Sequence, residues 1–157
     1  MSESISARVL RITPPVWFLS CAVAAIVLHV LVPIRLFTPG AIGYGAAAAL
    51  VAFGIGINLW TDRLFKLKGV DVLPTSTADR ELITSGPFRF TRNPMYLGMV
   101  AVLVGVAVAL GTLLPFLCAA CFLVLVNATY IPHEERKLAA QFGDAFAAYA
   151  QRTRRWL

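Results

Sequence analysis

Long apolar runs constrain this chain more than any other feature. Four of them, at about residues 15–36, 41–61, 94–110 and 113–131, contain a single charged side chain, Arg35. A helix of about 20 apolar residues crosses the hydrocarbon core of a bilayer. Within lipid the backbone must satisfy its own hydrogen bonds, which helices do. The pattern predicts an all-α, polytopic membrane protein with about four transmembrane helices.

Composition and length agree with this prediction. Of the 157 residues, 59% are hydrophobic and 14% charged, whereas soluble domains are nearer half apolar and a quarter charged. The length fits a single domain covering residues 1–157. The first run is long for a signal peptide and no clear cleavage site follows it, so we interpret it as a retained span.

The basic residues are distributed unevenly between the two sides of such a bundle. Thirteen of the fourteen flank the runs on the side of the N-terminal head, the 62–93 loop and the C-terminal segment, and Arg35 is alone on the other side. This asymmetry predicts four spans with both termini in the cytoplasm, in a membrane of the bacterial inner-membrane type. The net charge of +6 then indicates contact with anionic lipid headgroups. No nucleic-acid motif accompanies the charge, so we expect no nucleic-acid partner.

Isolated polar residues inside the runs favour structural roles. Cys21, Cys118 and Cys121 all lie in apolar sequence, and the CxxC spacing of the last two lacks the polar setting of a metal or redox pair. We expect packing roles for them and no metal site. His29 is interpreted as an interhelical hydrogen-bonding group.

Two polar segments far apart in the sequence are the main functional indication. They are residues 86–98, Gly-Pro-Phe-Arg-Phe-Thr-Arg-Asn-Pro-Met-Tyr-Leu-Gly, and residues 130–138, Tyr-Ile-Pro-His-Glu-Glu-Arg-Lys-Leu. The hairpin of the third and fourth runs returns the chain to the same membrane face, so the segments can meet. Pro94 is suited to the first turn of a helix. Arg89 and Arg92 beside that helix start favour an anion such as a carboxylate, or lipid phosphates.

The second segment begins a predicted amphipathic helix over residues 134–149, in which apolar side chains recur at helical spacing. Pro132 is expected to end the fourth span just before it. Glu134 and Glu135 point in different directions on a helix, so one can face a pocket while the other faces solvent or a basic residue. The alternative from spacing alone is a simple charge bias at the helix start, with Arg136 and Lys137 as surface partners. His133 is assigned either to the pocket or to a solvated surface.

The two segments together resemble a known family. The first is similar to the Gly-Pro-Tyr-Arg-Tyr-x-Arg-His/Asn-Pro-x-Tyr-x-Gly motif of the isoprenylcysteine carboxyl methyltransferase and phospholipid methyltransferase group. Glu134-Glu135-x-x-Leu138, then Phe142-Gly143 and Tyr149, resemble the Glu-Glu-x-x-Leu…Phe-Gly…Tyr pattern that follows it. The resemblance covers roughly residues 70–157, which would form the cofactor-binding part after the spans at 15–36 and 41–61.

The resemblance implies transfer of a methyl group from S-adenosylmethionine to a lipophilic acceptor, an isoprenylcysteine-type carboxylate or a phospholipid-type amine, at the cytoplasmic membrane face. Carried over position by position, the cofactor-binding residues would be Arg89, Arg92, Asn93, Pro94, Tyr96, Leu97, Gly98, Tyr130, His133, Glu134 and Glu135. Asn93 stands where many members have histidine. Because asparagine does not titrate near neutral pH, a mechanism needing a base at position 93 does not carry over.

Roles within this set follow from the chemistry of methyl transfer. The sulfonium is already activated, so alignment and exclusion of water are the main demands on the protein. Glu135, Arg92 and Tyr96 are the expected catalytic residues. Glu135 would orient the cofactor amine or the acceptor, and Arg92 would hold the carboxylate of either. Tyr96 and Tyr130 are positioned in sequence to face the sulfonium by cation–π attraction.

Two other functions fit the same hydropathy. One is an NADPH-dependent membrane reductase of the steroid or sterol type, which would need more polar contacts for a larger cofactor. The other is a non-enzymatic membrane scaffold. The identity of the acceptor and the oligomeric state are not determined by the sequence.

Overall fold

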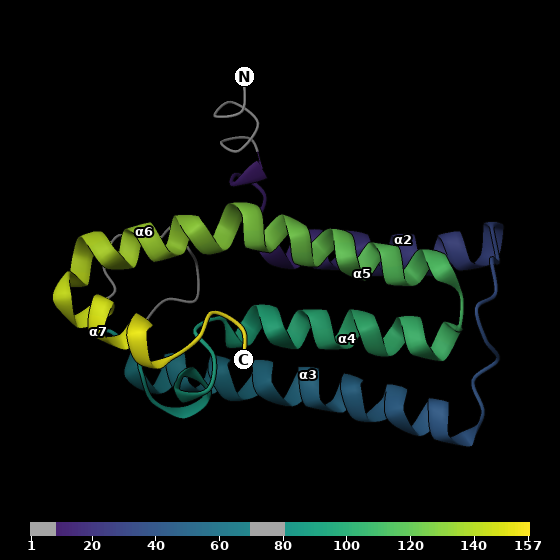
Figure 1. The fold of residues 1–157 in the computed structure, drawn as a ribbon, viewed down its shortest axis with the longest axis horizontal. Coiled ribbons are helices and arrows are strands. Elements are labelled where there is room, and N and C mark those ends of the chain that lie inside the picture. Colours follow the sequence, from purple (N-terminus) through teal and green to yellow (C-terminus); the bar gives the residue numbers. More distant parts are fainter. Residues whose placement is uncertain (1–8, 70–80) are drawn as a thin grey trace.

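The computed structural model describes residues 9–69 and 81–157 and, over these ranges, contains only helices and their connections. Residues 1–8 of the N-terminal head and residues 70–80 of the 62–93 loop, which include Arg8 and Arg80 of the charge asymmetry, lie outside the described residues. Helices α2 (Pro14–Leu31), α3 (Ala41–Lys68), α4 (Pro94–Leu110) and α5 (Leu113–Leu125) run side by side (Figure 1). Helix α3 packs along α4, and α2 packs along α5.

Three of the helical segments are long and apolar enough to cross a membrane. They are Pro14–Leu31, Ala41–Lys68 and Leu113–Phe142, with 18, 28 and 30 residues. The remaining apolar helix, Pro94–Leu110, has 17 residues and a length of about 25 Å at 1.5 Å per residue. The chain is therefore a polytopic, all-α membrane protein, as the hydropathy predicts.

The first two helices differ in extent from the predicted spans. Helix α2 ends at Leu31 rather than near residue 36, because Pro33 disfavours helical backbone at Val32 (φ −136°, ψ 73°). Helix α3 continues past residue 61 to Lys68, where Gly69 in the left-handed region (φ 64°) ends it. The polar residues after Trp60 mark the edge of the apolar part of α3, not its end.

Pro132 does not end the fourth helix, contrary to the prediction. Residues Val126–Tyr130 form a π-helical turn, and the Ile131 N–H donates to the carbonyl of Val126, five residues earlier. This wider turn accommodates a proline that has no N–H to donate, so the helix continues as α6 (Ile131–Phe142). A proline inside a helix is absorbed here by a π-bulge.

The predicted amphipathic helix over 134–149 is two helices. Gly143 (φ 49°) separates α6 from α7 (Asp144–Arg152), because its backbone conformation is one that side-chain-bearing residues rarely adopt. Helix α7 therefore turns back beneath α6 at the end of the bundle where α3 ends and the short 3-10 helix Gly86–Arg89 lies (Figure 1).

The interior of the bundle is built from α4, α5 and the π turn. Its buried cluster consists of Tyr96, Met99, Leu103, Ala119, Phe122, Val126, Tyr130 and Ile131. At the opposite end of the bundle from α7, the ring nitrogen Nδ1 of His29 lies 2.9 Å from Thr112 Oγ1, an interhelical hydrogen bond of the expected kind.

Close approach of α3 and α4 depends on glycine. A Cβ added at Gly54 would contact the carbonyl oxygen of Gly98 and lie 2.7 Å from a methyl carbon of Val102. A Cβ at Gly98 would lie 2.7 Å from the Gly54 carbonyl and from the side-chain amide of Asn58. Small residues at such crossings let helices pack backbone to backbone, which is the main source of helix association in lipid.

We expect Gly54→Ala to destabilise the protein by about 1–3 kcal/mol, because the methyl group must push α3 and α4 apart. Thermal unfolding in detergent micelles measures the effect. Gly56→Ala is the matched control, since nothing lies within 4 Å of a Cβ at Gly56 and alanine is the better helix former. Equal melting temperatures for the two variants would contradict this account of the α3–α4 contact.

Candidate functional site

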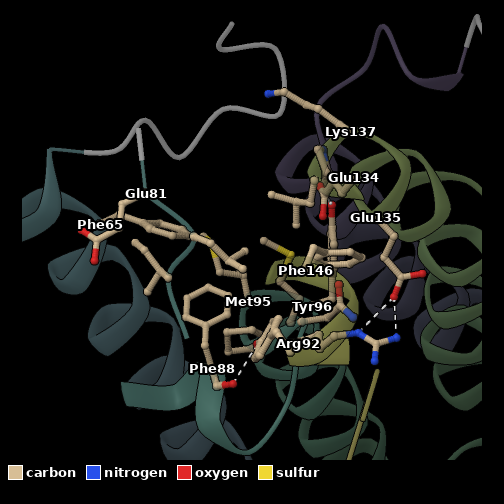
Figure 2. Close-up of a pocket in the computed structure, with 18 of the residues that line it drawn as sticks. Phe65, Glu81, Phe88, Arg92, Met95, Tyr96, Glu134, Glu135, Lys137 and Phe146 are labelled. Atoms are coloured by element: carbon tan, nitrogen blue, oxygen red, sulfur yellow. Dashed lines mark hydrogen bonds and ion pairs between the residues drawn. The ribbon is translucent and has the colours of Figure 1, made fainter. Parts of the chain in front are cut away.

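A cleft of about 260 Å³ opens at the end of the bundle where α7 turns back. Its lining comes from the end of α3, the segment before η1 (Gly86–Arg89), the start of α2, the start of α4, and α6 and α7. The lining residues are Thr13, Pro14, Pro15, Phe65, Glu81, Leu82, Ile83, Phe88, Arg92, Asn93, Pro94, Met95, Tyr96, Met99, Glu134, Glu135, Lys137, Leu138, Phe146 and Tyr149. Phe65 and Glu81 lie on one side and Glu134 and Glu135 on the other (Figure 2).

The two polar segments meet in this cleft through an ion pair. Arg92 Nη2 lies 2.8 Å from Glu135 Oε1, and Arg92 Nε donates to the same oxygen at 3.2 Å (Figure 2). The exposed fractions of the two side chains are 16% and 19%. An ion pair shielded to this degree is stronger than one on an open surface. It fixes the loop before α4 to α6.

The rest of the Arg92 guanidinium is also engaged. Its Nη1 donates to the carbonyl of Ala150 at 2.9 Å and to that of Thr153 at 2.7 Å. With the two bonds to Glu135, four of the five N–H donors of this side chain have partners within the protein. Arg92 therefore clamps α6, α7 and the residues after α7 together.

The second carboxylate oxygen of Glu135 accepts a hydrogen bond from Arg155. Arg155 Nη2 donates to Glu135 Oε2, and its Nε donates to Oε1 at 3.2 Å. The hydrogen bond to Glu135 raises the pKa of Arg155 above its usual range, so the Arg155 guanidinium stays charged beside this carboxylate. Glu135 is thus held by arginines on both of its oxygens.

Glu134 takes the other direction from α6. The Tyr96 hydroxyl donates to Glu134 Oε1 at 2.6 Å, within the range of hydrogen bonds to a charged acceptor. Tyr96 is buried, in the first turn of α4, and Glu134 is half-buried. Both side chains line the cleft, so this pair sets a carboxylate beside an aromatic ring in its wall (Figure 2).

The remaining walls are largely aromatic and apolar. The rings of Phe65 and Phe88 lie 5.5 Å apart between centroids. The Tyr149 hydroxyl donates to the Phe88 carbonyl at 2.8 Å and ties α7 to η1. Burial raises the pKa of Tyr149 to about 12, so this phenol stays protonated as a donor throughout the physiological range.

The structure brings six of the eleven residues expected at the site into the lining of the cleft: Arg92, Asn93, Pro94, Tyr96, Glu134 and Glu135. It places the other five, Arg89, Leu97, Gly98, Tyr130 and His133, outside that lining. Arg89 is exposed at the end of η1, and Gly98 packs against α3. The Tyr130 hydroxyl donates to the backbone carbonyls of Val9 and Ile12.

Several residues at the cleft were not singled out from the sequence. The aromatic and thioether side chains of Phe65, Phe88, Met95, Met99 and Phe146 look like ordinary membrane-helix or interface residues when read one by one. Arg155 was counted only among the basic residues of the C-terminal segment that set the predicted orientation. No pattern in the sequence identifies its partner. Over the described residues, no group of three or more His, Cys, Asp or Glu is placed to hold a metal ion.

Comparison of the sequence with known protein families identifies the family of this chain. The sequence model of the family described as phospholipid methyltransferase matches residues 42–145, a range that contains α4, α5, α6 and the cleft side chains they carry. The chain belongs to the phospholipid methyltransferase family. It is a membrane methyltransferase of a family that acts on lipids.

A shorter bacterial protein is similar to part of this chain. An uncharacterized protein of Haemophilus influenzae (strain ATCC 51907 / DSM 11121 / KW20 / Rd) is 36% identical over 63 residues. The match covers 40% of this chain and 100% of that protein. No solved structure matches the chain.

We expect Arg92→Gln to lower the free energy of unfolding by about 2–4 kcal/mol, because it frees one side of a shielded carboxylate and two carbonyls at once. Lys66→Gln is the control, since it removes an exposed ion pair with Asp62 and should cost less than about 1 kcal/mol. Chemical or thermal unfolding in micelles compares them. A loss no larger than that of Lys66→Gln would show that the Arg92 clamp contributes little.

Proposed function

We propose that this protein transfers a methyl group from S-adenosylmethionine to a lipophilic acceptor that reaches the cleft from the bilayer. The observation that carries the proposal is the meeting of the 86–98 and 130–138 segments at a cleft at one end of a membrane-spanning bundle. Family membership supports the same reaction class. S-adenosylmethionine would supply the methyl group in activated form, on a sulfonium.

The residues of the cleft fit such a cofactor. Its sulfonium and ammonium are cationic and its adenine is flat and aromatic. The Glu134 carboxylate and the Tyr96 ring offer negative potential to a cation. The rings of Phe65 and Phe88 offer an apolar surface to a flat base. We assign Tyr96 and Glu134 to cofactor contact, and Arg92 and Glu135 to holding the walls in place.

The acceptor we favour within the family is an amine. A carboxylate acceptor needs a cationic partner, and Arg92 in the cleft lining is committed to Glu135 and two backbone carbonyls. The other charged side chains of the lining are Lys137 and the two carboxylates of Glu81 and Glu134, so the anions outnumber the remaining cation. Glu134 instead presents an anion to the cleft, which suits an ammonium headgroup. For transfer, the amine must first lose a proton, and a nearby carboxylate can accept it.

We propose that the cleft lies at the cytoplasmic face of the membrane. The described basic residues other than Arg35 lie on the elements around the cleft end, among them Arg63, Lys66, Arg89, Arg136 and Arg152. Basic residues flanking spans are retained in the cytoplasm. The acceptor would then enter from the inner leaflet, beside Pro14 and Pro15 at the start of α2, which line the cleft.

Titration calorimetry of the protein in detergent micelles tests which cofactor it binds. We expect binding of S-adenosylhomocysteine and none of NADPH. Binding of NADPH alone would support a reductase, and binding of neither would support a scaffold. Glu134→Gln should weaken S-adenosylmethionine binding by roughly tenfold or more, because it removes the charge of a hydrogen-bonded carboxylate that would face the cationic sulfonium and ammonium. Asp144→Asn, at an exposed position that starts α7, is the control and should bind normally.

The pH dependence of turnover tests the acceptor. An amine reacts only when unprotonated, so its transfer rate should rise with pH across the neutral and mildly alkaline range, towards an amine pKa of about 10. A carboxylate is fully ionised above about pH 6, and its methylation should be flat over the same range. Radiolabelled methyl transfer to amine-headgroup lipids and to prenylcysteine analogues distinguishes them. Transfer only to the prenylcysteine analogue would refute the amine assignment.

A further inference from the structure

The residues that follow α7 lie across the cleft end as an extended segment. Residues 153–157, here called the strap, begin where Thr153 adopts extended backbone (φ −121°, ψ 126°). The carbonyl of Arg154 accepts the backbone N–H of Arg92 at 3.0 Å. The strap therefore bonds, main chain to main chain, to the loop that starts α4.

Side chains of the same loop add two more bonds to the strap. Thr91 Oγ1 donates to the carbonyl of Arg155 at 3.1 Å, and Asn93 Nδ2 donates to the same oxygen at 2.8 Å. Asn93 is the N-cap residue of α4, where asparagine usually bonds to the helix's own N–H groups, yet it makes no such bond. Thr91 and Asn93 are both buried, and each gives its donor to the strap.

The strap also reaches the opposite wall. The Arg155 side chain holds both oxygens of Glu135 on α6. One residue on, Trp156 Nε1 donates to Asn127 Oδ1 at 3.2 Å, in the π turn that precedes α6. Five residues thus connect the start of α4 to α6 and to the π turn, the elements that carry Tyr96 and Glu134.

We propose that the strap sets the separation of α4 and α6 at the cleft, and that Arg155 is a positioning residue that acts through Glu135. Glu134 and Glu135 are neighbours on α6, so any rotation of α6 that Glu135 permits moves Glu134 relative to Tyr96. With Arg155 removed, Glu135 is restrained by Arg92 from one side only. The effect on cofactor affinity rests on the proposed function, whereas the restraint on α6 does not.

Hydrogen–deuterium exchange of the full protein in micelles tests the restraint itself. Arg155→Gln should raise exchange in peptides that cover residues 91–97 and 131–138, compared with the unaltered protein. Arg154→Gln is the matched control, because the Arg154 side chain is exposed and its hydrogen bond within the described part of the chain goes to the Leu157 carbonyl, at 3.5 Å. Arg155→Lys keeps the charge but cannot bridge both oxygens, and should fall between the two. Unchanged exchange in Arg155→Gln would overturn the proposal.

Cofactor affinity tests the positioning role. We expect Arg155→Gln to raise the Kd for S-adenosylhomocysteine and the KM for S-adenosylmethionine at least fivefold, with partial recovery of both in Arg155→Lys. Arg154→Gln should match the unaltered protein. Increased exchange with unchanged affinity would overturn the positioning role. If the unaltered protein binds no S-adenosylhomocysteine, the proposed function fails, and the exchange experiment still decides whether the strap restrains α6.

Discussion

One carboxylate shared by two arginines holds the cleft end of this protein together. Glu135 extends from α6, Arg92 from the loop before α4, and Arg155 from the residues after α7. Removing charges from water is costly, and the cost is recovered only where the remaining donors have partners. Here Arg92 meets that condition, since its other donors point at the carbonyls of Ala150 and Thr153. Each of the three charged groups keeps the others in a fixed geometry.

The adjacent glutamates divide the work because of helix geometry. Neighbouring residues on a helix project in different directions, so one turn of α6 faces two environments. Glu135 faces Arg92 and Arg155, which hold both of its oxygens. Glu134 faces the buried phenol of Tyr96 and the cleft. A Glu-Glu pair after a membrane span is thus explained without assigning both carboxylates to the same chemical role.

Hydropathy predicted the helices that the bilayer requires. The bounds of α4, residues 94–110, and the start of α5 at Leu113 follow directly from apolar runs bounded by Pro94 and Gly111-Thr112. The meeting of the 86–98 and 130–138 segments followed from the hairpin, because both ends of a two-helix hairpin return to one membrane face. The extension of α3 to Lys68 was not predicted, because an apolar run marks the part of a helix that lies in lipid and not the end of the helix.

The other misses share a physical cause. Pro132 was expected to end a helix, but whether a π turn absorbs a proline depends on packing around Val126 and Tyr130, both buried in the bundle core. Arg155 was not predicted at the site, because a long, flexible side chain has no sequence pattern that identifies its partner. Backbone periodicity is local and can be counted, whereas side-chain pairing across 20 or 43 positions is decided only in three dimensions.

The distribution of polar groups also bears on the kind of reaction this cleft suits. Most donors at the cleft end are spent within the protein, on Glu135, on Glu134 and on the carbonyls of the strap and α7. A reaction that develops a new oxyanion would require donors left unpaired and aimed at it. Methyl transfer from a sulfonium to an amine instead moves an existing positive charge from sulfur to nitrogen, so it needs alignment and exclusion of water more than new hydrogen bonds. A rigid, largely apolar cleft with its polar groups paired among themselves is matched to that demand.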